Sequence, residues 1–328
     1  MAAARRKVDS HLSSGVVCQP EPVRFAFISS IVEEQDKSGI PRRDRYPIEL
    51  MCRILAVSRS GYYAWSSRQE SAHAQRDAEL SAEIVKIDRD HEGRYGIDRI
   101  HAELAKAGHA TSQRRVRRLA RAAGLRCVHP AARRRNTTVQ DPANNRGLID
   151  LVERNFFPEA PNEIWYGDVT YIWTLAGWAY LATVIDGFSR QVIGWAAADH
   201  MREELVLDAL RMAIARRRPA QGQTVMHTDR GSAYTGRAFR DLCLDHGILP
   251  SVGKTGICFD NAAAESFNAL YKKELIHLSI WSEPQQVRAA TFEYIEVYYN
   301  RTRIQRQLGY LSPAQYESIF DNNLALAA

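Results

Sequence analysis

The stretch Ile164-Trp-Tyr-Gly-Asp168-Val-Thr-Tyr-Ile-Trp173 decides the fold of the second half of this chain. Its aromatic and β-branched residues favour a β-strand. Asp168 stands in the middle of the stretch, where an acid is poorly placed for strand propensity alone. The stretch therefore predicts a strand whose carboxylate serves some purpose other than forming the strand.

The pattern that follows this strand is that of an α/β domain. Gly177 and Asp186-Gly187 supply turns, and helical segments then alternate with short apolar strands. Strands are expected at 164–173, 178–185, 191–198, 224–228 and 249–252, and helices at 203–217, 239–246, 260–275 and 284–299. Three antiparallel strands followed by alternating helices and parallel strands predict a ribonuclease-H-like core, a mixed five-stranded sheet with flanking helices. The order of the strands in the sheet does not follow from this pattern.

The first half of the chain has an all-α pattern with two candidate helix-turn-helix units. In the first unit, helices at 47–55 and 59–65 flank a tight turn, and Ser58 is a suitable N-cap for the second of them. A longer helix at 74–91 follows, with an apolar stripe made by Leu80, Ile84, Ile87 and His91. The first unit is weakly specified, because many helical hairpins share its pattern.

The second candidate unit carries a clearer sign of nucleic-acid binding. Its first helix has an apolar face of Ile97, Ile100 and Leu104 and ends at Gly108. Its second helix starts at Thr111 or Ser112, ends at Gly124 and is expected to turn three side chains inward: Val116, Leu119 and Ala123. Five arginines occupy its other faces: Arg114, Arg115, Arg117, Arg118 and Arg121. A helix with a narrow apolar seam and five arginines fits a DNA groove or backbone.

Positive charge is concentrated around this second unit. The net charge of the chain is +6, yet between Arg94 and Arg146 there are 13 Lys and Arg against 3 Asp and Glu, a local balance of +10. The rest of the chain must then carry about −4. So biased a block points to a polyanion, most simply double-stranded DNA. A solvated basic surface without a partner is the plainer alternative.

Composition divides the 328 residues into five parts. They are a disordered tail at 1–22, a helical DNA-binding region at 23–128, a basic linker at 129–157, an α/β core at 158–320 and a tail at 321–328. No apolar run is long enough to span a bilayer, and no secretory signal is visible, so a cytoplasmic location without a membrane partner is expected. The five cysteines are scattered without a CxxC pair, which favours reduced thiols over a zinc site.

Three carboxylates stand at informative places in the α/β half. Asp168 lies within the first strand, Asp229 directly follows the strand at 224–228, and Glu265 lies in the first turns of a helix. The start of that helix, Asp260-Asn261, is a good capping pair. Each acid alone is more simply a surface residue or a cap, but the three contexts together favour a cluster. Carboxylates suit Mg²⁺ or Mn²⁺, so the three are candidate metal ligands and catalytic residues.

Such a cluster would support chemistry at a phosphodiester. Two ions about 3.5–4 Å apart can clamp an in-line displacement, one activating the nucleophile and the other stabilising the leaving oxygen. Joining of strands would need no separate enzyme, because a DNA 3′-hydroxyl can replace water as the nucleophile.

Two lysines are candidate DNA contacts near the acids. Lys272 lies two helical turns after Glu265 and on the same face, although a solvated helix lysine is an equally good interpretation of the spacing. Lys254 lies in the Gly-rich loop 253–256, which is too short for a nucleotide-binding P-loop.

Several further motifs carry a family resemblance. They are Trp165-Tyr-Gly-Asp-Val-Thr-Tyr-Ile172, Val184-Ile-Asp-Gly-Phe-Ser-Arg190 with Gly194-Trp195, His227-Thr-Asp-Arg-Gly-Ser-Ala-Tyr234, Asp260-Asn-Ala-Ala-Ala-Glu-Ser-Phe267, and Tyr299-Asn-Arg301 with Leu308-Gly-Tyr-Leu-Ser-Pro313. These stretches resemble the OrfB-type transposases of the insertion-sequence-three family, relatives of retroviral integrases. The 35 residues between Asp229 and Glu265 match the spacing of that family. The resemblance covers about Val23 to Ser318.

The resemblance implies a DDE polynucleotidyl transferase that depends on Mg²⁺. It implies Asp168, Asp229 and Glu265 as the metal ligands and Lys272 as a DNA contact. It also implies recognition of terminal inverted repeats, insertion into target DNA and a homo-oligomer on DNA, and it strengthens both helix-turn-helix interpretations. Members often work as a fusion with an upstream reading frame, so a subunit from such a frame is a further candidate partner.

The chain departs from the family pattern at three places. Gly187 replaces a bulkier apolar residue, Gln305 stands where a histidine is common, and the first twenty or so residues match nothing in the family. Two other functions stay open at this point. One is a non-catalytic DNA-binding regulator or partial subunit, and the other is a nuclease acting on RNA–DNA hybrids, which the paired helix-turn-helix units disfavour.

Overall fold

The computed structural model describes residues 16–41, 44–68, 71–127, 150–152, 158–253 and 262–327. Contacts divide the chain into two compact units, Met1–Glu79 and Leu80–Ala328. The two units meet between Glu79 and Leu80, whereas the sequence suggested a boundary at residue 129. The second candidate helix-turn-helix unit contacts the α/β core and is grouped with it. The expected basic linker lies largely outside the described residues.

The first unit has a small helical core. Its elements are η1 (Val16–Cys18), α2 (Glu21–Lys37), α3 (Ile48–Ile54) and α4 (Arg59–Ser66). Phe25, Ile28 and Tyr62 are buried together in it. The Ser58 hydroxyl accepts a hydrogen bond from the Gly61 amide at 2.9 Å, so the predicted N-cap of α4 is present. η1 and the first residues of α2 fall within the range 1–22 that was expected to be a tail.

Three helices open the second unit: α5 (Ala72–Asp90), whose first residues precede Leu80, α6 (Ile97–Lys106) and α7 (Gln113–Ala122). Leu80 and Ile84 of α5 pack with Ile100, Leu104, Val116 and Leu119. Ser112 caps α7 through a hydrogen bond from the Arg115 amide. The third inward side chain of α7 is Ala120, not Ala123 as the sequence suggested. The helix ends at Ala122, so Ala123 lies at the exposed C-cap.

The α/β core is built on one mixed sheet of five strands, β1 (Ile164–Thr174), β2 (Gly177–Asp186), β3 (Val192–Ala198), β4 (Thr224–Thr228) and β5 (Ile248–Val252). Its order is β3-β2-β1-β4-β5, with β1, β2 and β3 antiparallel and β1, β4 and β5 parallel. The predicted mixed five-stranded sheet is confirmed, and its order places the carboxyl end of β4 beside the middle of β1.

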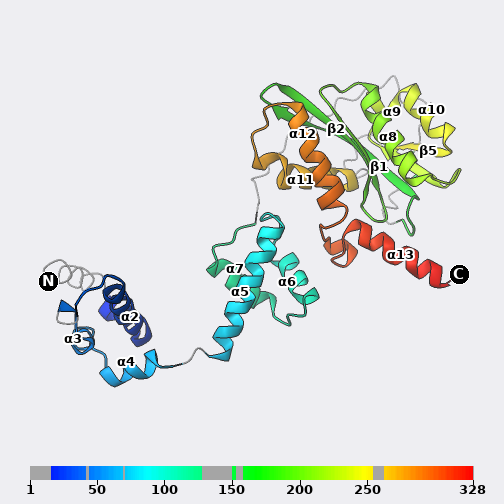
Figure 1. Ribbon diagram of the computed structural model, residues 1–328. Coiled ribbons are helices and arrows are strands. Elements are labelled where there is room, and N and C mark those ends of the chain that lie inside the picture. Colours follow the sequence, from blue (N-terminus) through cyan, green and yellow to red (C-terminus); the bar gives the residue numbers. More distant parts are fainter. Residues whose placement is uncertain are drawn as a thin grey trace. The chain divides into compact units, whose positions relative to one another are not determined.

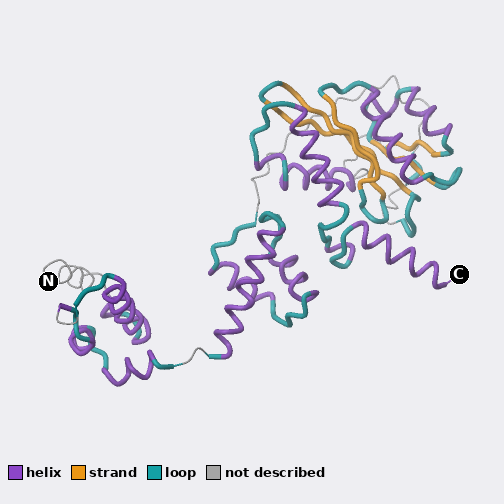
Figure 2. Tube along the Cα trace, in the orientation of Figure 1, coloured by secondary structure: helices purple, strands orange, loops and turns teal. Residues whose placement is uncertain are grey.

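Helices cover both faces of this sheet (Figures 1 and 2). One face packs on α8 (Glu203–Arg217) and α10 (Arg237–Asp245), and the short α9 (Ser232–Thr235) lies between β4 and α10 in the chain. The other face packs on α11 (Ala262–Glu274), α12 (Pro284–Phe292) and the π-helical η5 (Glu293–Tyr299). Each face has a separate hydrophobic core, so β1 is buried on both sides along its first half.

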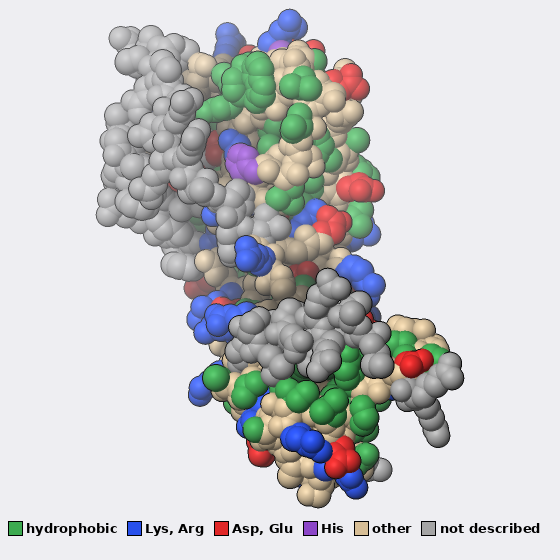
Figure 3. Space-filling view, turned by 90° about the vertical axis from the view of Figure 1, so that its left-hand side faces the viewer, with side chains coloured by type: hydrophobic (Ala, Val, Ile, Leu, Met, Phe, Trp, Pro, Cys, Tyr) green, Lys and Arg blue, Asp and Glu red, His purple; other side chains and the backbone are tan. Residues whose placement is uncertain are grey.

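The remaining elements are η4 (Ile276–Leu278), between α11 and α12, and η6 (Arg306–Leu308) and α13 (Pro313–Ala327), which follow η5. α13 runs through the boundary expected at residue 320, so 321–327 continue a helix instead of forming a separate tail. Large hydrophobic side chains stay exposed at several places, among them Trp173, Leu175 and Trp178. Figure 3 shows one face on which hydrophobic side chains reach the surface between charged ones. Within the described part of the chain, no helix is both long and apolar enough to cross a membrane.

Gly194 sets how closely α8 approaches β3. A Cβ atom at Gly194 would lie 2.2 Å from the Ala209 carbonyl oxygen and 2.7 Å from the Ala213 amide nitrogen. We expect Gly194→Ala to destabilise the chain by about 1–3 kcal/mol, because backbone atoms of α8 must move to relieve the overlap. Urea unfolding followed by tryptophan fluorescence measures this. Gly96→Ala, which meets no atom within 4 Å, is the control, and an equal loss in both variants would contradict the expectation.

Candidate active site

The sheet order brings two of the predicted acids to one place. Asp168 is the fifth residue of β1, and Asp229 follows the last residue of β4, whose Thr228 pairs with Gly167. Gly167 permits this approach, because a Cβ atom there would lie 2.5 Å from the Met226 Cε and 3.0 Å from the Thr228 Cγ2. Asp229 is held by its own turn, where its Oδ1 accepts from the Gly231 amide at 2.9 Å. The parallel pair β1–β4 thus fixes both carboxylates.

The third acid arrives on a helix packed across the same strand. Glu265 is the fourth residue of α11, which contacts β1 and buries Ala264 and Phe267 against the sheet. Glu265 is exposed, while Asp168 and Asp229 are half-buried. The capping pair Asp260-Asn261 predicted for this helix lies outside the described residues, as does Lys254.

The three carboxylates repel one another through space. Burial and the charges of Asp229 and Glu265 raise the pKa of Asp168 to about 7, against hydrogen bonds from Asn268 and the Val169 amide. Burial also raises the pKa of Asp229. Burial and then the Asp229 charge raise the pKa of Glu265. Such a set has more negative charge than its surroundings balance.

Two buried polar side chains complete this cluster. Asn268, one helical turn after Glu265, donates from Nδ2 to Asp168 Oδ2 at 2.8 Å. Tyr234 is buried beside both aspartates, whose charges together with burial raise its pKa. Among the described residues, the Tyr234 hydroxyl and the Asn268 Oδ1 find no hydrogen-bond partner. Sequence reasoning missed both, although the spacing of Asn268 from Glu265 places it on the same helix face.

Lys272 supplies a cation at the edge of the cluster. Its Nζ lies 4.8 Å from the centre of the Tyr171 ring, and the Asp168 charge opposes the lowering of its pKa by burial. The half-buried Lys272 is therefore not the freely solvated lysine that its spacing alone allowed.

The oxygen atoms of this cluster are of the kind that bind a divalent cation, although the side chains are not arranged closely enough to enclose one. Three carboxylates and two unsatisfied polar oxygens are hard ligands of the kind that Mg²⁺ and Mn²⁺ prefer. In the part of the chain that the structure describes, no three His, Cys, Asp or Glu side chains are grouped closely enough to enclose a metal ion.

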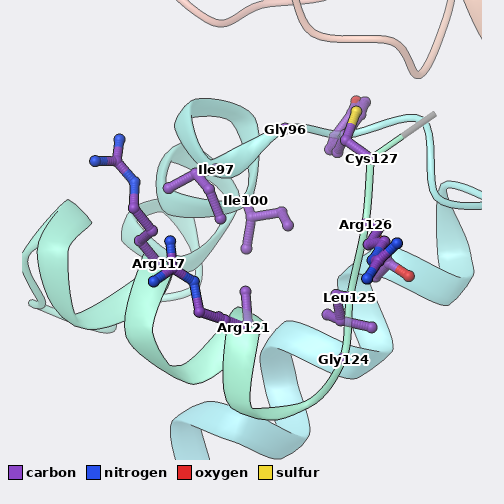
Figure 4. A pocket seen from close by; sticks show the side chains of 12 residues that line it. Gly96, Ile97, Ile100, Arg117, Arg121, Gly124, Leu125, Arg126 and Cys127 are labelled. Carbon is purple, nitrogen blue, oxygen red and sulfur yellow. The ribbon is translucent and has the colours of Figure 1, made fainter. Parts of the chain in front are cut away.

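The arginines of α7 form a second candidate site. Arg114, Arg117, Arg118 and Arg121 are exposed, and Arg115 is half-buried. Next to them, α6, α7 and the segment after α7 line a pocket of about 540 Å³. Figure 4 shows Arg117 and Arg121 on one side of this pocket and Arg126 and Cys127 on the other, with Ile97 and Ile100 between them. The arginines Arg117, Arg121 and Arg126 thus lie on two sides of the apolar residues Ile97 and Ile100.

Comparison with known proteins decides the family. The model of the Integrase core domain matches residues 158–258, a second Integrase core domain model matches 265–319, and the HTH-like domain model matches 74–135. A transposase for insertion sequence element IS629 of Shigella sonnei is 35% identical over 86% of this chain and 97% of its own. Transposase InsF for insertion sequence IS3A of Escherichia coli is 36% identical over 83% of this chain and 94% of its own.

The chain belongs to this family of insertion-sequence transposases. Among solved structures, the catalytic core of the HTLV-2 integrase in complex with magnesium is similar, with 20% identity and a TM-score of 0.37, over 48% of this chain and 98% of that one. The HTH-like match begins within α5 and includes α6 and α7, and from Leu80 onward these helices belong to the same unit as the sheet.

A buried ion pair lies where these two parts of the transposase contact each other. Arg303 is 1% exposed, and its Nε and Nη2 donate to the two carboxylate oxygens of Glu274 at 2.8 and 2.7 Å. Glu274 is the last residue of α11, the helix that carries Glu265. Arg94, between α5 and α6, donates to the Glu274 carbonyl at 3.1 Å. The end of the Glu265 helix is therefore anchored to the helix-turn-helix region.

Two departures from the family pattern have structural explanations in this transposase. A Cβ atom at Gly187 would lie 2.9 Å from the Tyr166 ring and 3.0 Å from the Ile164 carbonyl, so glycine fits where these residues pack closely. Gln305 is buried and pairs with Leu311 in an isolated bridge. Its contacts are thus with the C-terminal turn.

Proposed function

We propose that the transposase cuts and joins DNA strands at the ends of an insertion sequence, with Asp168, Asp229 and Glu265 as its catalytic residues. What supports this is the placement of the three acids on β1, at the end of β4 and on α11: burial raises the pKa of each, and the charge of Asp229 raises the pKa of Asp168 and of Glu265. A surface acid or a helix cap would not need such an environment. Catalytic groups commonly do.

The three carboxylates would hold divalent cations, Mg²⁺ or Mn²⁺, and a pair of them fits phosphodiester chemistry. When bound, such ions supply Lewis-acid activation of the attacking hydroxyl and charge stabilisation at the leaving oxygen. Asp168 lies centrally and is oriented by the hydrogen bond from Asn268. Lys272 places its ammonium group beside Asp168, where it would bind a DNA phosphate.

DNA is the partner of the basic helix. Arg114, Arg117, Arg118 and Arg121 are exposed on α7, and they would contact phosphates of the terminal inverted repeats or of the target. Oligomerisation on DNA and a subunit from an upstream reading frame belong to this proposal. An oligomer of this kind would hold the two ends of the insertion sequence and the target DNA together.

The exposed arginines of α7 give a prediction about salt dependence. We expect Arg117→Gln and Arg121→Gln each to reduce the slope of log Kd against log salt by about one, because each loses one phosphate contact. Fluorescence anisotropy with duplex DNA at several salt concentrations measures this. Arg237→Gln, on the exposed face of α10, is the control. Equal slopes in all three variants would remove α7 from the DNA interface.

The function itself is tested with duplex DNA ending in the inverted repeats that flank the coding sequence. The full chain should nick these ends and join them to a target in Mg²⁺ or Mn²⁺, and should do neither in EDTA. Binding with a steep salt dependence, but no cleavage in either metal, would instead favour the non-catalytic regulator. If cleavage is still absent after the upstream-frame protein is added, a missing subunit is excluded as the reason for the lack of cleavage.

A further inference from the structure

The β1–β2 hairpin extends beyond the strands that flank it. β4 pairs with β1 only from Ile164 to Gly167, and β3 pairs with β2 only from Tyr180 onward. Beyond Gly167, β1 therefore has no strand on its β4 side, and residues 172–174 of β1 with 177–179 of β2 form a two-stranded ribbon. One face of this ribbon packs into the core through Ile172 and Ala179.

The other face of the ribbon carries a row of aromatic rings. Trp173 and Trp178 are direct cross-strand partners with ring centres 5.0 Å apart, and Tyr171 lies 5.3 Å from Trp178. Side chains alternate along a strand, so Tyr171 and Trp173 share a face. Trp173 is 59% exposed and Trp178 is 43% exposed, so no described element of the chain covers them. We name Tyr171, Trp173 and Trp178 the aromatic row.

The aromatic row lies near the acidic site, on the face of β1 opposite the Asp168 side chain. Tyr171 follows Asp168 by three residues, about 10 Å along a strand. The Lys272 ammonium lies 4.8 Å from the centre of the Tyr171 ring and within electrostatic range of Asp168. A cation followed by adjacent exposed rings matches the two parts of a nucleotide, because the phosphate pairs with the ammonium and the base stacks on the rings.

We propose that the aromatic row is a stacking surface for unpaired bases of the DNA strand that reaches the acidic site. The inference rests on the proposed function, since it supposes that a phosphodiester lies at Asp168. A DNA strand with a phosphodiester at Asp168 would pass Lys272 and Tyr171 before it reaches Trp178 and Trp173. Stacking on aromatic rings tolerates any base, so the row holds frayed or displaced nucleotides without reading their sequence.

Binding of single-stranded DNA that contains 2-aminopurine tests this surface. The full chain is used in EDTA, so that no cleavage occurs and a failure of catalysis leaves the readout intact. We expect Trp173→Ala and Trp178→Ala each to weaken binding about 5- to 150-fold and to reduce the quenching of the 2-aminopurine fluorescence. Trp173→Phe should retain most of the binding affinity and most of the fluorescence quenching. Phe292→Ala, an exposed aromatic residue of α12, is the matched control and should change neither.

Photocrosslinking locates the contact. With 5-bromouracil in the same oligonucleotide, the peptide that contains 171–178 should carry the cross-link. Two results would overturn the proposal. One is binding by both tryptophan variants as tight as that of Phe292→Ala, with cross-links confined to other peptides. The other is unchanged DNA binding together with a loss of self-association in the tryptophan variants, which would assign the row to contact with a second copy of the chain.

Discussion

We expect Asp168→Asn, Asp229→Asn and Glu265→Gln each to reduce DNA cleavage and strand transfer by at least roughly a thousandfold. Divalent cations held by such carboxylates supply several kcal/mol of transition-state stabilisation, and about 4 kcal/mol corresponds to that factor. The substitutions keep the size of each side chain, so packing around β1, β4 and α11 is preserved. Single-turnover cleavage of labelled element-end DNA in Mn²⁺ measures the loss.

A fold defect would mimic this loss, so stability is measured in parallel. In metal-free buffer the three carboxylates repel one another, and removal of one charge should therefore not lower the melting temperature. Asp199→Asn, at an exposed acid just after β3, is the control and should retain full activity. Near-normal cleavage by any one of the three triad variants would remove that residue from the catalytic set.

We expect Glu274→Gln to destabilise the transposase by about 3–5 kcal/mol. It would leave the Arg303 guanidinium buried without a counter-charge, and removal of one partner from a buried ion pair typically has this effect. Tyr294, which donates to Glu274 Oε2 at 2.9 Å, would also lose a charged acceptor. Urea unfolding of the full chain measures the loss.

The matched control is an exposed ion pair of the same unit. Asp208→Asn breaks a contact with Arg211 whose two side chains are 61% and 57% exposed, and such pairs contribute less than about 1 kcal/mol. The double variant Glu274→Leu with Arg303→Met should recover much of the loss, because the buried charge is then absent. An equal loss in Glu274→Gln and Asp208→Asn would contradict a structural role for the buried pair.

Local patterns predicted most of the fold because the relevant signals are short-range. The strand around Asp168, the caps at Ser58 and Ser112 and the alternation of helices and strands all depend on neighbouring residues. Helix ends were less certain: α7 ends at Ala122, which leaves Ala123 exposed at its C-cap, and α13 continues past 320. Local helix propensity differs little between a helix and the same helix with a few residues added or removed at its end, so it does not fix the last residue.

Long-range pairings could not be predicted in the same way. The contact of Arg94 with Glu274 joins residues 180 positions apart, and no periodicity shows it. The division at Leu80 follows from such contacts and not from the composition change near residue 129. At the acidic site, the positions of Asp168, Asp229 and Glu265 follow from strand and helix placement. The neighbours Asn268 and Tyr234 emerge only when the sheet order and the packing of α11 are known.

Titration of the full chain with Mn²⁺ tests the central claim that the three acids form one cation site. Manganese binding by the wild type, followed by calorimetry or by the loss of the free-ion paramagnetic resonance signal, should raise its stability by about 2.7 kcal/mol at a hundred times the Kd. Asp168→Asn, Asp229→Asn and Glu265→Gln should each bind the ion more weakly and lose that gain, while Asp199→Asn should keep it. Equal Mn²⁺ binding and stabilisation in the wild type and all three triad variants would contradict the account.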